Sequence, residues 1–399
     1  MQLSKILSLL AASALGLLLA TATVPYSRVL LPSTSAPAQT APPPTLITIA
    51  DLAGEPWPWP RLDLTLLLRA ISPYRPNPVG LLLPLDAPDV LEPAQDDQMA
   101  RALASFETSV LPATTFPPLA ITETLSLPKI PHHGSLQSLR AADSFLAPEK
   151  SLRHSATLAA WKITPDADGQ LRRLPLIFRQ ADSVIPSWLL VMYARALNAD
   201  LTQSELQGRR LILRNAQGLH LQTIPLDLRG SVPIDWNQAE PTTTKMEIRG
   251  VVLAAEQERI GLPPYFNLQA ISRQPVLIAT TLAEVDPSIN SPIGKHALAD
   301  AVLRTWTRLS AGPTPVLHPP SWLILSVLFA SAGLGLSSGQ RWHIGLIEAC
   351  GLAGLVFGAG WIAVKLGGYS GALPLTLGSF LATLIAPRLQ KWMETSHVR

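Results

Sequence analysis

The apolar residues of this 399-residue chain are concentrated in long blocks at its two ends. The first block runs from Ile6 to Val24, and three more follow at Trp322–Leu336, Ile344–Val364 and about Leu366–Ala386. Each is close to the ~20 residues that a helix needs to cross a bilayer. Because backbone groups cannot stay unpaired in lipid, the short connections between the last three blocks favour helical hairpins. We therefore expect four transmembrane helices, one N-terminal and three C-terminal.

The composition agrees with a membrane protein. Charged residues make up only 15% of the chain, against ~25% in ordinary soluble domains. The formal net charge of +3 is too small for the basic patch that nucleic-acid binding requires, so no nucleic-acid partner is expected. Cys350 is the single cysteine, which excludes an internal disulfide framework and a cysteine-rich zinc site.

The first apolar block has two interpretations. It is long enough for an uncleaved anchor, and Ala20-Thr21-Ala22 also has the small-x-small form of a signal-peptide cleavage site. Both interpretations send the following chain out of the cytoplasm. Cations in short loops favour the cytoplasmic side. With the N-terminus inside, that side holds Lys5, Arg341, Arg388, Lys391 and Arg399, and the outer hairpin holds only Lys365.

The topology predicts a multi-pass inner-membrane protein with a large periplasmic domain. We divide the chain into an anchor or signal peptide at 1–24, a proline-rich linker at 25–44, an extracytoplasmic domain at 45–318, a three-helix transmembrane region at 319–387 and a cytoplasmic tail at 388–399. The linker is rich in Pro, Ala, Ser and Thr and suits a semi-extended spacer. The tail is too short for a catalytic domain.

The extracytoplasmic segment alternates strand and helix patterns. We expect buried strands at Leu46–Asp51, Val79–Leu83, Ser109–Pro112 and Pro275–Thr280, and helices at Leu62–Ile71, Asp96–Phe106, Pro186–Leu197 and His296–Trp306. This alternation predicts an α/β domain with a mostly parallel sheet flanked by helices. Two hairpins are expected within it. One joins Ala156–Ile163 to Leu171–Phe178 through an Asp-Gly turn, and the other joins Leu211–Arg214 to Leu219–Ile224.

Two stretches of this segment carry a family resemblance. Gly54–Arg61 (GEPWPWPR) is very similar to a G-x-W-P-W-P-R signature, and Pro165–Leu176 matches P-D-x-D-G-x-x-R-R-x-P-L. They resemble the CHASE2 domain, an extracellular sensor module of bacterial membrane receptors, over roughly residues 26–310. The resemblance implies a sensor fold with one leading and three trailing transmembrane helices. The signature positions are Arg61, Asp166, Asp168, Gly169, Arg172 and Arg173.

The chain departs from the family pattern in two places. The family's G-x-E-I-H-A-N stretch is here Gly294–Asp300 (GKHALAD), in which Lys or His replaces a carboxylate. Family members usually continue into a kinase or nucleotide cyclase, whereas this chain ends in the short tail. The resemblance therefore implies sensing without implying a particular output.

The candidate ligand site lies at strand ends. Asp51 and Asp86 both follow predicted parallel strands, where open α/β sheets carry their ligand crevice. With Asp96 nearby in sequence, they could bind a cationic ligand, although capping or turn formation explains each one singly. Trp57 and Trp59 alternate with prolines. They could form a stacking surface for a ligand or a wedge that fixes the loop to the sheet.

Other chemistry is weakly represented. Arg172 and Arg173 are adjacent, so on a strand they would face opposite sides. Structural pairing of one with Asp166 or Asp168 is favoured over anion binding. His132 and His133 lack a third ligand at suitable spacing. Without a nucleophile, phosphate-loop or zinc motif, we expect no enzyme activity, no cofactor and no metal.

The apolar block at Ile344–Val364 has two features of its own. Gly351, Gly354 and Gly358 let helices approach closely, either within the three-helix region or in a homodimer. Glu348 is an acid within the predicted membrane helix. An ion role and snorkelling toward Arg341 or His343 both remain open for it.

The hypothesis that follows is a non-enzymatic membrane sensor. Its external domain would bind an unknown ligand or partner and signal through the transmembrane helices to a separate protein. The alternative is a structural or assembly component of a cell-envelope complex, with a sensor fold that no longer senses. The departure at Gly294–Asp300 motivates this alternative.

Overall fold

The computed structural model describes residues 40–49, 60–89, 92–115, 125, 127–142, 144–236, 241, 243–280 and 289–311. All of them fall within one compact unit, residues 36–313. Within these ranges, no helix has the length and apolar character needed to span a bilayer. The four predicted transmembrane helices lie outside the described residues, as do Asp51, Trp57, Trp59, Glu348, Gly351, Gly354 and Gly358.

A seven-stranded, mostly parallel sheet forms the centre of the domain, as predicted. Its strands are β1 (Thr45–Ile49), β2 (Val79–Leu82), β3 (Ser109–Thr115), β5 (Phe145–Leu146), β6 (Thr157–Trp161), β14 (Lys245–Glu247) and β15 (Val276–Thr280). The order is β14-β1-β15-β2-β3-β5, with β6 also paired to β3. Only β5 runs antiparallel to its neighbour.

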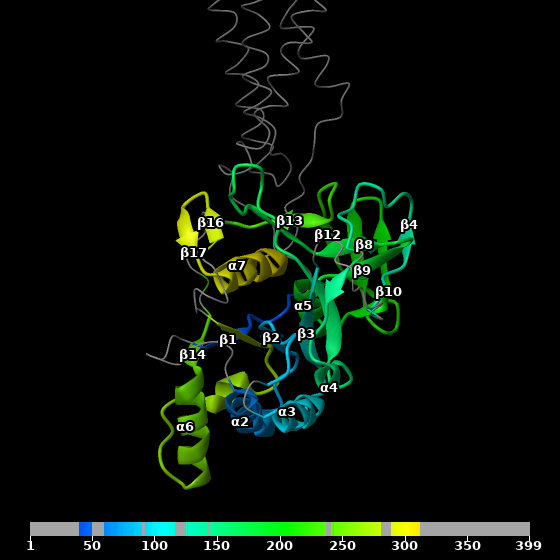
Figure 1. Cartoon of the computed structure of the whole chain (residues 1–399). Helices are drawn as coiled ribbons and strands as arrows, with labels where there is room; N and C mark the ends of the chain where they lie inside the picture. Colours follow the sequence, from blue (N-terminus) through cyan, green and yellow to red (C-terminus); the bar gives the residue numbers. More distant parts are fainter. Residues whose placement is uncertain are drawn as a thin grey trace, which may run out of the picture. The chain divides into compact units, whose positions relative to one another are not determined.

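Helices cover both faces of this sheet (Figure 1). One face packs against α2 (Arg61–Ile71), α3 (Ala94–Ala104) and α6 (Ile248–Arg259), and the other against α5 (Trp188–Ala196) and α7 (Leu298–Ser310). Ile47 and Ile49 join the first core, whereas Leu46 joins the second. Two-sided burial explains why the strands are continuous apolar runs. Short helices α4 (Lys150–Arg153), η1 (Ser72–Tyr74) and η2 (Leu268–Ile271) are also present among the described residues.

A smaller β region is formed mainly by residues between β6 and β14. β10 (Asp200–Gln207), β11 (Arg210–Arg214) and β12 (His220–Pro225) pair antiparallel, and β4 (His132–His133) joins β10. The predicted hairpin at Leu211–Ile224 is thereby confirmed as β11–β12. Three further two-stranded pairs are β8 (Ile177–Gln180) with β9 (Ser183–Pro186), β7 (Arg173–Pro175) with β13 (Ser231–Pro233), and β16 (Ile289–Ser291) with β17 (Gly294–His296).

The predicted hairpin between Ala156–Ile163 and Leu171–Phe178 is wrong. β6 pairs in parallel with β3, and β7 pairs with β13. The Asp-Gly turn itself is present, because the Asp166 amide donates to the Gln170 carbonyl at 2.8 Å and Gly169 has a φ of +78°. The turn therefore leads the chain out of the central sheet into the β region. Local turn chemistry specifies a reversal, but burial on both faces placed β6 in the parallel sheet.

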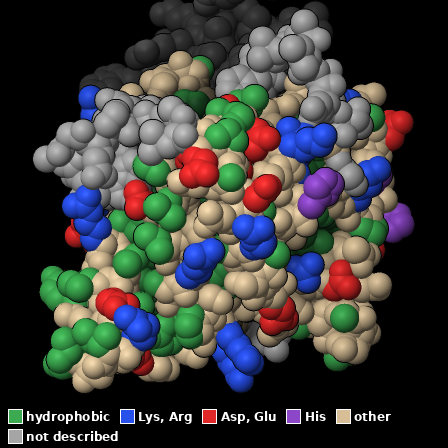
Figure 2. Space-filling model, turned by 60° about the horizontal axis from the view of Figure 1, so that its bottom comes forward, with side chains coloured by type: hydrophobic (Ala, Val, Ile, Leu, Met, Phe, Trp, Pro, Cys, Tyr) green, Lys and Arg blue, Asp and Glu red, His purple; other side chains and the backbone are tan. Residues whose placement is uncertain are grey.

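The outer surface of the α2, α3 and α6 layer carries mixed charges and exposed apolar side chains. Figure 2 shows the hydrophobic ones gathered toward one side of this face. Leu62 and Leu66 of α2 are exposed, as are Leu253 of α6 and Ile260 just beyond it. These side chains are not covered by any described element.

Candidate functional site

Arg61, the last residue of the tryptophan-proline signature, begins α2 and is buried. Its Nε atom donates to Asp96 Oδ1 at 3.0 Å, and both side chains are below 5% exposed. Its Nη2 donates to the Ala87 carbonyl at 2.7 Å, and its backbone amide donates to Asp89 Oδ2 at 2.6 Å. The guanidinium therefore connects the start of α2 to the loop after β2 and to α3.

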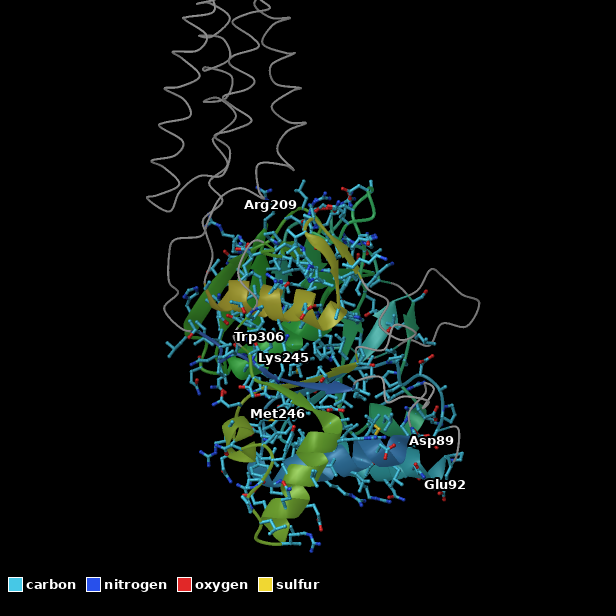
Figure 3. The ribbon with its side chains drawn as sticks, turned by 90° about the vertical axis from the view of Figure 1, so that its left-hand side faces the viewer. Asp89, Glu92, Arg209, Lys245, Met246 and Trp306 are labelled. Atoms are coloured by element: carbon cyan, nitrogen blue, oxygen red, sulfur yellow. The ribbon has the colours of Figure 1, made fainter. Side chains whose placement is uncertain are left out.

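The two acids complete this Arg61 network. Asp96 Oδ2 accepts the Asp89 amide at 2.8 Å, and Asp89 Oδ1 accepts the Glu92 amide at 2.8 Å. Figure 3 shows Asp89 and Glu92 beside the ends of the helices on this face of the sheet, away from Trp306. Both oxygens of Asp96 have protein partners. Asp96 therefore supports the fold as a buried partner of Arg61, and its ligand role remains a prediction.

The predicted pairing of Asp51 with Asp86 depends on strand order. β15 lies between β1 and β2, so the ends of β1 and β2 are two strand spacings, or roughly 10 Å, apart. Asp86 is exposed and lies beyond the end of β2. Asp51, Trp57 and Trp59 fall outside the described residues. Among the described residues at the carboxyl edge of the sheet, Asp86 is an exposed carboxylate, and Asp96 is buried in its ion pair with Arg61.

The second signature forms a network of ion pairs. Arg172 lies 3.2 Å from Asp166 and 2.6 Å from Asp168, and Arg173 lies 3.4 Å from Asp166 and 3.1 Å from Asp227. The hydrogen bond from Arg172 lowers the pKa of Asp168. Both arginines reach Asp166, contrary to the opposite-face expectation. The reason is that Arg172 precedes β7, so strand alternation does not apply to the pair.

A tight turn between β12 and β13 supports this network. Asp227 Oδ1 accepts the backbone amides of Arg229 and Ser231 at 2.9 and 2.8 Å. Gly230 has a φ of +78°, and a Cβ there would lie 2.6 Å from Ile177 Cγ1. Only glycine fits this position, so the turn is held close to the start of β8.

A third cluster joins the two ends of the described domain. The Trp306 Nε1 of α7 donates to the Pro42 carbonyl at 3.0 Å, and Ser310 Oγ donates to the Ala41 carbonyl at 3.1 Å. The segment before β1 is therefore fastened to the last helix. We call this contact the Trp306 junction, and Figure 3 marks Trp306.

Buried polar groups extend the Trp306 junction to α5 and β12. The Tyr193 ring of α5 meets the Trp306 ring edge-on at 5.3 Å. Its hydroxyl donates to Gln222 Oε1 at 2.9 Å, and Gln222 Nε2 donates to the Leu309 carbonyl at 2.7 Å. Burial raises the pKa of Tyr193 to about 12. Sequence reasoning missed this cluster. The available sequence signal was Trp306 in the last helix, because a buried tryptophan needs an acceptor for its indole N–H.

The departure from the family pattern lies beside α7. His296, at the end of β17, stacks on Trp236 at 4.9 Å and lies 3.9 Å from Asp300 in the first turn of α7. The substituted stretch therefore still packs onto the last helix.

His132 and His133 form the short strand β4 beside an open surface depression. Side chains of β4 border an open depression of about 300 Å³ between Ile130, Asp182 and Thr202. His133 is 74% exposed and lies 3.7 Å from Glu205. Within the described residues, no group of three His, Cys, Asp or Glu side chains is arranged to hold a metal ion.

Comparison with known proteins gives one match. The family model described as the CHASE2 domain matches residues 37–334, which is more than half of the chain. The matched span includes all of the described residues and extends past the 310 expected from the motifs. No curated protein and no solved structure matches.

Proposed function

Because the chain belongs to the CHASE2 domain family, whose members carry an extracellular sensor module, we propose that it is a membrane-anchored extracytoplasmic sensor. The proposal includes the four transmembrane helices and the inner-membrane location predicted from the apolar blocks. A separate membrane or cytoplasmic protein would read the signal. No catalytic step, metal or cofactor is part of this function.

The Trp306 junction is the observation that carries the coupling part of the proposal. It ties Pro42, near the end of the predicted linker, to α7, which precedes the first of the three C-terminal apolar blocks. Tyr193 and Gln222 connect the same point to α5 and β12. A rearrangement of the domain core would therefore shift the segment before β1 and helix α7 at the same time. Ligand binding can drive such a change only by its different affinity for the two arrangements.

Cys350 offers a readout that needs no knowledge of the output protein. It is the single cysteine and lies in the apolar block at Ile344–Val364. The full chain, purified in a non-ionic detergent, would be screened by thermal shift against small anions, amino acids and sugars. For each compound that stabilises it, we expect the rate of Cys350 alkylation by a maleimide to change.

Trp306→Phe is the matched variant, because it keeps a ring but removes the indole N–H that binds Pro42. We expect it to bind the compound while the response of Cys350 alkylation falls. An unchanged response in Trp306→Phe would contradict coupling through the Trp306 junction.

The envelope-assembly alternative predicts different results. A structural component would co-purify with one envelope complex, and no small molecule would raise its melting temperature. His296 and Asp300 of the altered stretch still contact each other at 3.9 Å. This altered stretch therefore remains part of the fold in either function.

A further inference from the structure

Three arginines from separate segments converge beside the second signature. Arg140 precedes the bridge between Ala141 and Arg179, Arg173 begins β7, and Arg229 lies in the β12–β13 turn. Contacts between the segments hold them close together. Leu139 Cδ2 is 3.2 Å from the position that a Cβ on Gly230 would occupy, and Arg173 lies 3.1 Å from Asp227. Leu139 precedes Arg140 and Gly230 follows Arg229, so the contact between Leu139 and Gly230 brings the backbones of the two arginines near each other.

The charges of this region do not balance. The three carboxylates Asp166, Asp168 and Asp227 are engaged by Arg172 and Arg173. Among the described residues, neither the Arg140 nor the Arg229 guanidinium group makes a hydrogen bond or a salt bridge, although Asp227 and Asp166 attract Arg140. Arg140 Nε is also buried from solvent without an acceptor. A buried donor that lacks an acceptor is costly, so an acceptor from outside the chain would be stabilising here.

The pKa of Arg140 depends on burial and on the charged groups around it. Burial and the charge of Arg229 lower the pKa of Arg140, and Arg173 adds to this effect. Asp227 and Asp166 oppose it without restoring the ordinary pKa. An anion beside Arg140 would offset the repulsion from Arg229 and Arg173.

We propose that Arg140, Arg173 and Arg229 form a binding site for a phosphate-type oxyanion, either free or as part of a headgroup. A guanidinium group donates two parallel hydrogen bonds to oxyanions. Donors that come from three segments suit the tetrahedral oxygens of phosphate better than a planar carboxylate. The inference deepens the proposed function by naming the chemistry of the ligand, and it rests on that function for its purpose.

The test compares two double variants of the full chain in non-ionic detergent. Arg140→Gln with Arg229→Gln removes the two free guanidinium groups and spares Arg173, which holds Asp227. Arg69→Gln with Arg101→Gln removes the same charge from the exposed surfaces of α2 and α3. Inorganic phosphate would be titrated by calorimetry through the millimolar range at constant ionic strength. A parallel arm would use mixed micelles that contain phosphatidylglycerol.

We expect saturable phosphate binding by the wild-type chain and by the α2/α3 control. The Arg140/Arg229 variant should bind at least about ten-fold more weakly, because bonds to charged donors are the strong ones. If the wild-type chain binds only the phosphatidylglycerol micelles and the Arg140/Arg229 variant loses this binding, the oxyanion is a lipid headgroup. Absence of saturable binding in both arms, or equal binding by the two double variants, would overturn the site. Phosphate binding without a change in Cys350 alkylation would leave the site standing and contradict the coupling instead.

Discussion

At the scale of single residues, the Arg61–Asp96 ion pair explains why the first signature ends in arginine. Both side chains are below 5% exposed, and the pair joins the starts of α2 and α3. Replacing Arg61 by Met leaves the Asp96 carboxylate buried without its partner. We expect the free energy of unfolding to fall by about 3–5 kcal/mol, measured by urea denaturation of the purified chain.

The matched control for this change is Arg172→Met. Arg172 also belongs to a signature, but its ion pairs with Asp166 and Asp168 are partly exposed, with 22–49% of each side chain accessible. Exposed pairs are screened and contribute little, so the loss should be much smaller. Equal losses in the two variants would contradict the assignment of the Arg61 network as buried support.

Tyr193 gives the domain a predicted weakness at alkaline pH. Burial raises its pKa from 10.0 to about 12, so the folded state keeps a proton that the unfolded state releases. Its contribution to stability is complete below pH 10 and is lost as the pH rises from 10 to about 12. The full contribution corresponds to about 2–3 kcal/mol.

Tyr193→Phe tests this directly. Near neutral pH the variant should be less stable by about 0.5–1.5 kcal/mol, because the hydrogen bond to Gln222 is lost. Above pH 10 the deficit should shrink, since phenylalanine has no proton to release. Unfolding curves of both chains across this range measure the difference. A deficit that stays constant with pH would show that the Tyr193 hydroxyl is not buried as the structure has it.

At the scale of elements, close packing between β2 and α5 depends on Gly80. A Cβ at this position would lie 2.5 Å from the Trp188 ring and 2.6 Å from Met192. We expect Gly80→Val to lower the free energy of unfolding by about 1–3 kcal/mol through overpacking. Adding Met192→Ala should recover part of the loss, because it removes one of the two groups that clash. A Gly80→Val chain with an unchanged urea midpoint would contradict this packing.

The sequence predicted elements better than it predicted their partners. Continuous apolar runs identified β1, β2 and β15, because burial on both faces leaves that pattern without any long-range information. The pairing of β6 with β3 was missed. The Asp168-Gly169 turn predicts only a local reversal of the chain and not which strands pair with each other. The α6 helix and the strand β10 were also missed.

The site was harder to predict for the same reason. Arg172 and Asp168 are four residues apart, so their pairing was accessible from the sequence. Arg140 and Arg229 are far apart in the chain, and only the β12–β13 turn brings them together. The partner of Trp306 is the Pro42 carbonyl, a backbone group that no side-chain motif records. Contacts of this kind depend on the folded topology.

At the scale of the whole molecule, the account depends on the α/β domain lying outside the cytoplasm, where it can meet a ligand. Two single-cysteine chains in a Cys350→Ala background test this. Gln217→Cys lies in the exposed turn between β11 and β12, and Ser396→Cys lies in the predicted cytoplasmic tail.

The decisive measurement is labelling of these two chains in intact spheroplasts by a membrane-impermeant maleimide. The account predicts that Gln217→Cys is labelled at once and that Ser396→Cys is labelled only after the membrane is permeabilised. Labelling of Ser396→Cys in intact spheroplasts, with Gln217→Cys protected until permeabilisation, would place the domain inside and contradict the proposed sensor.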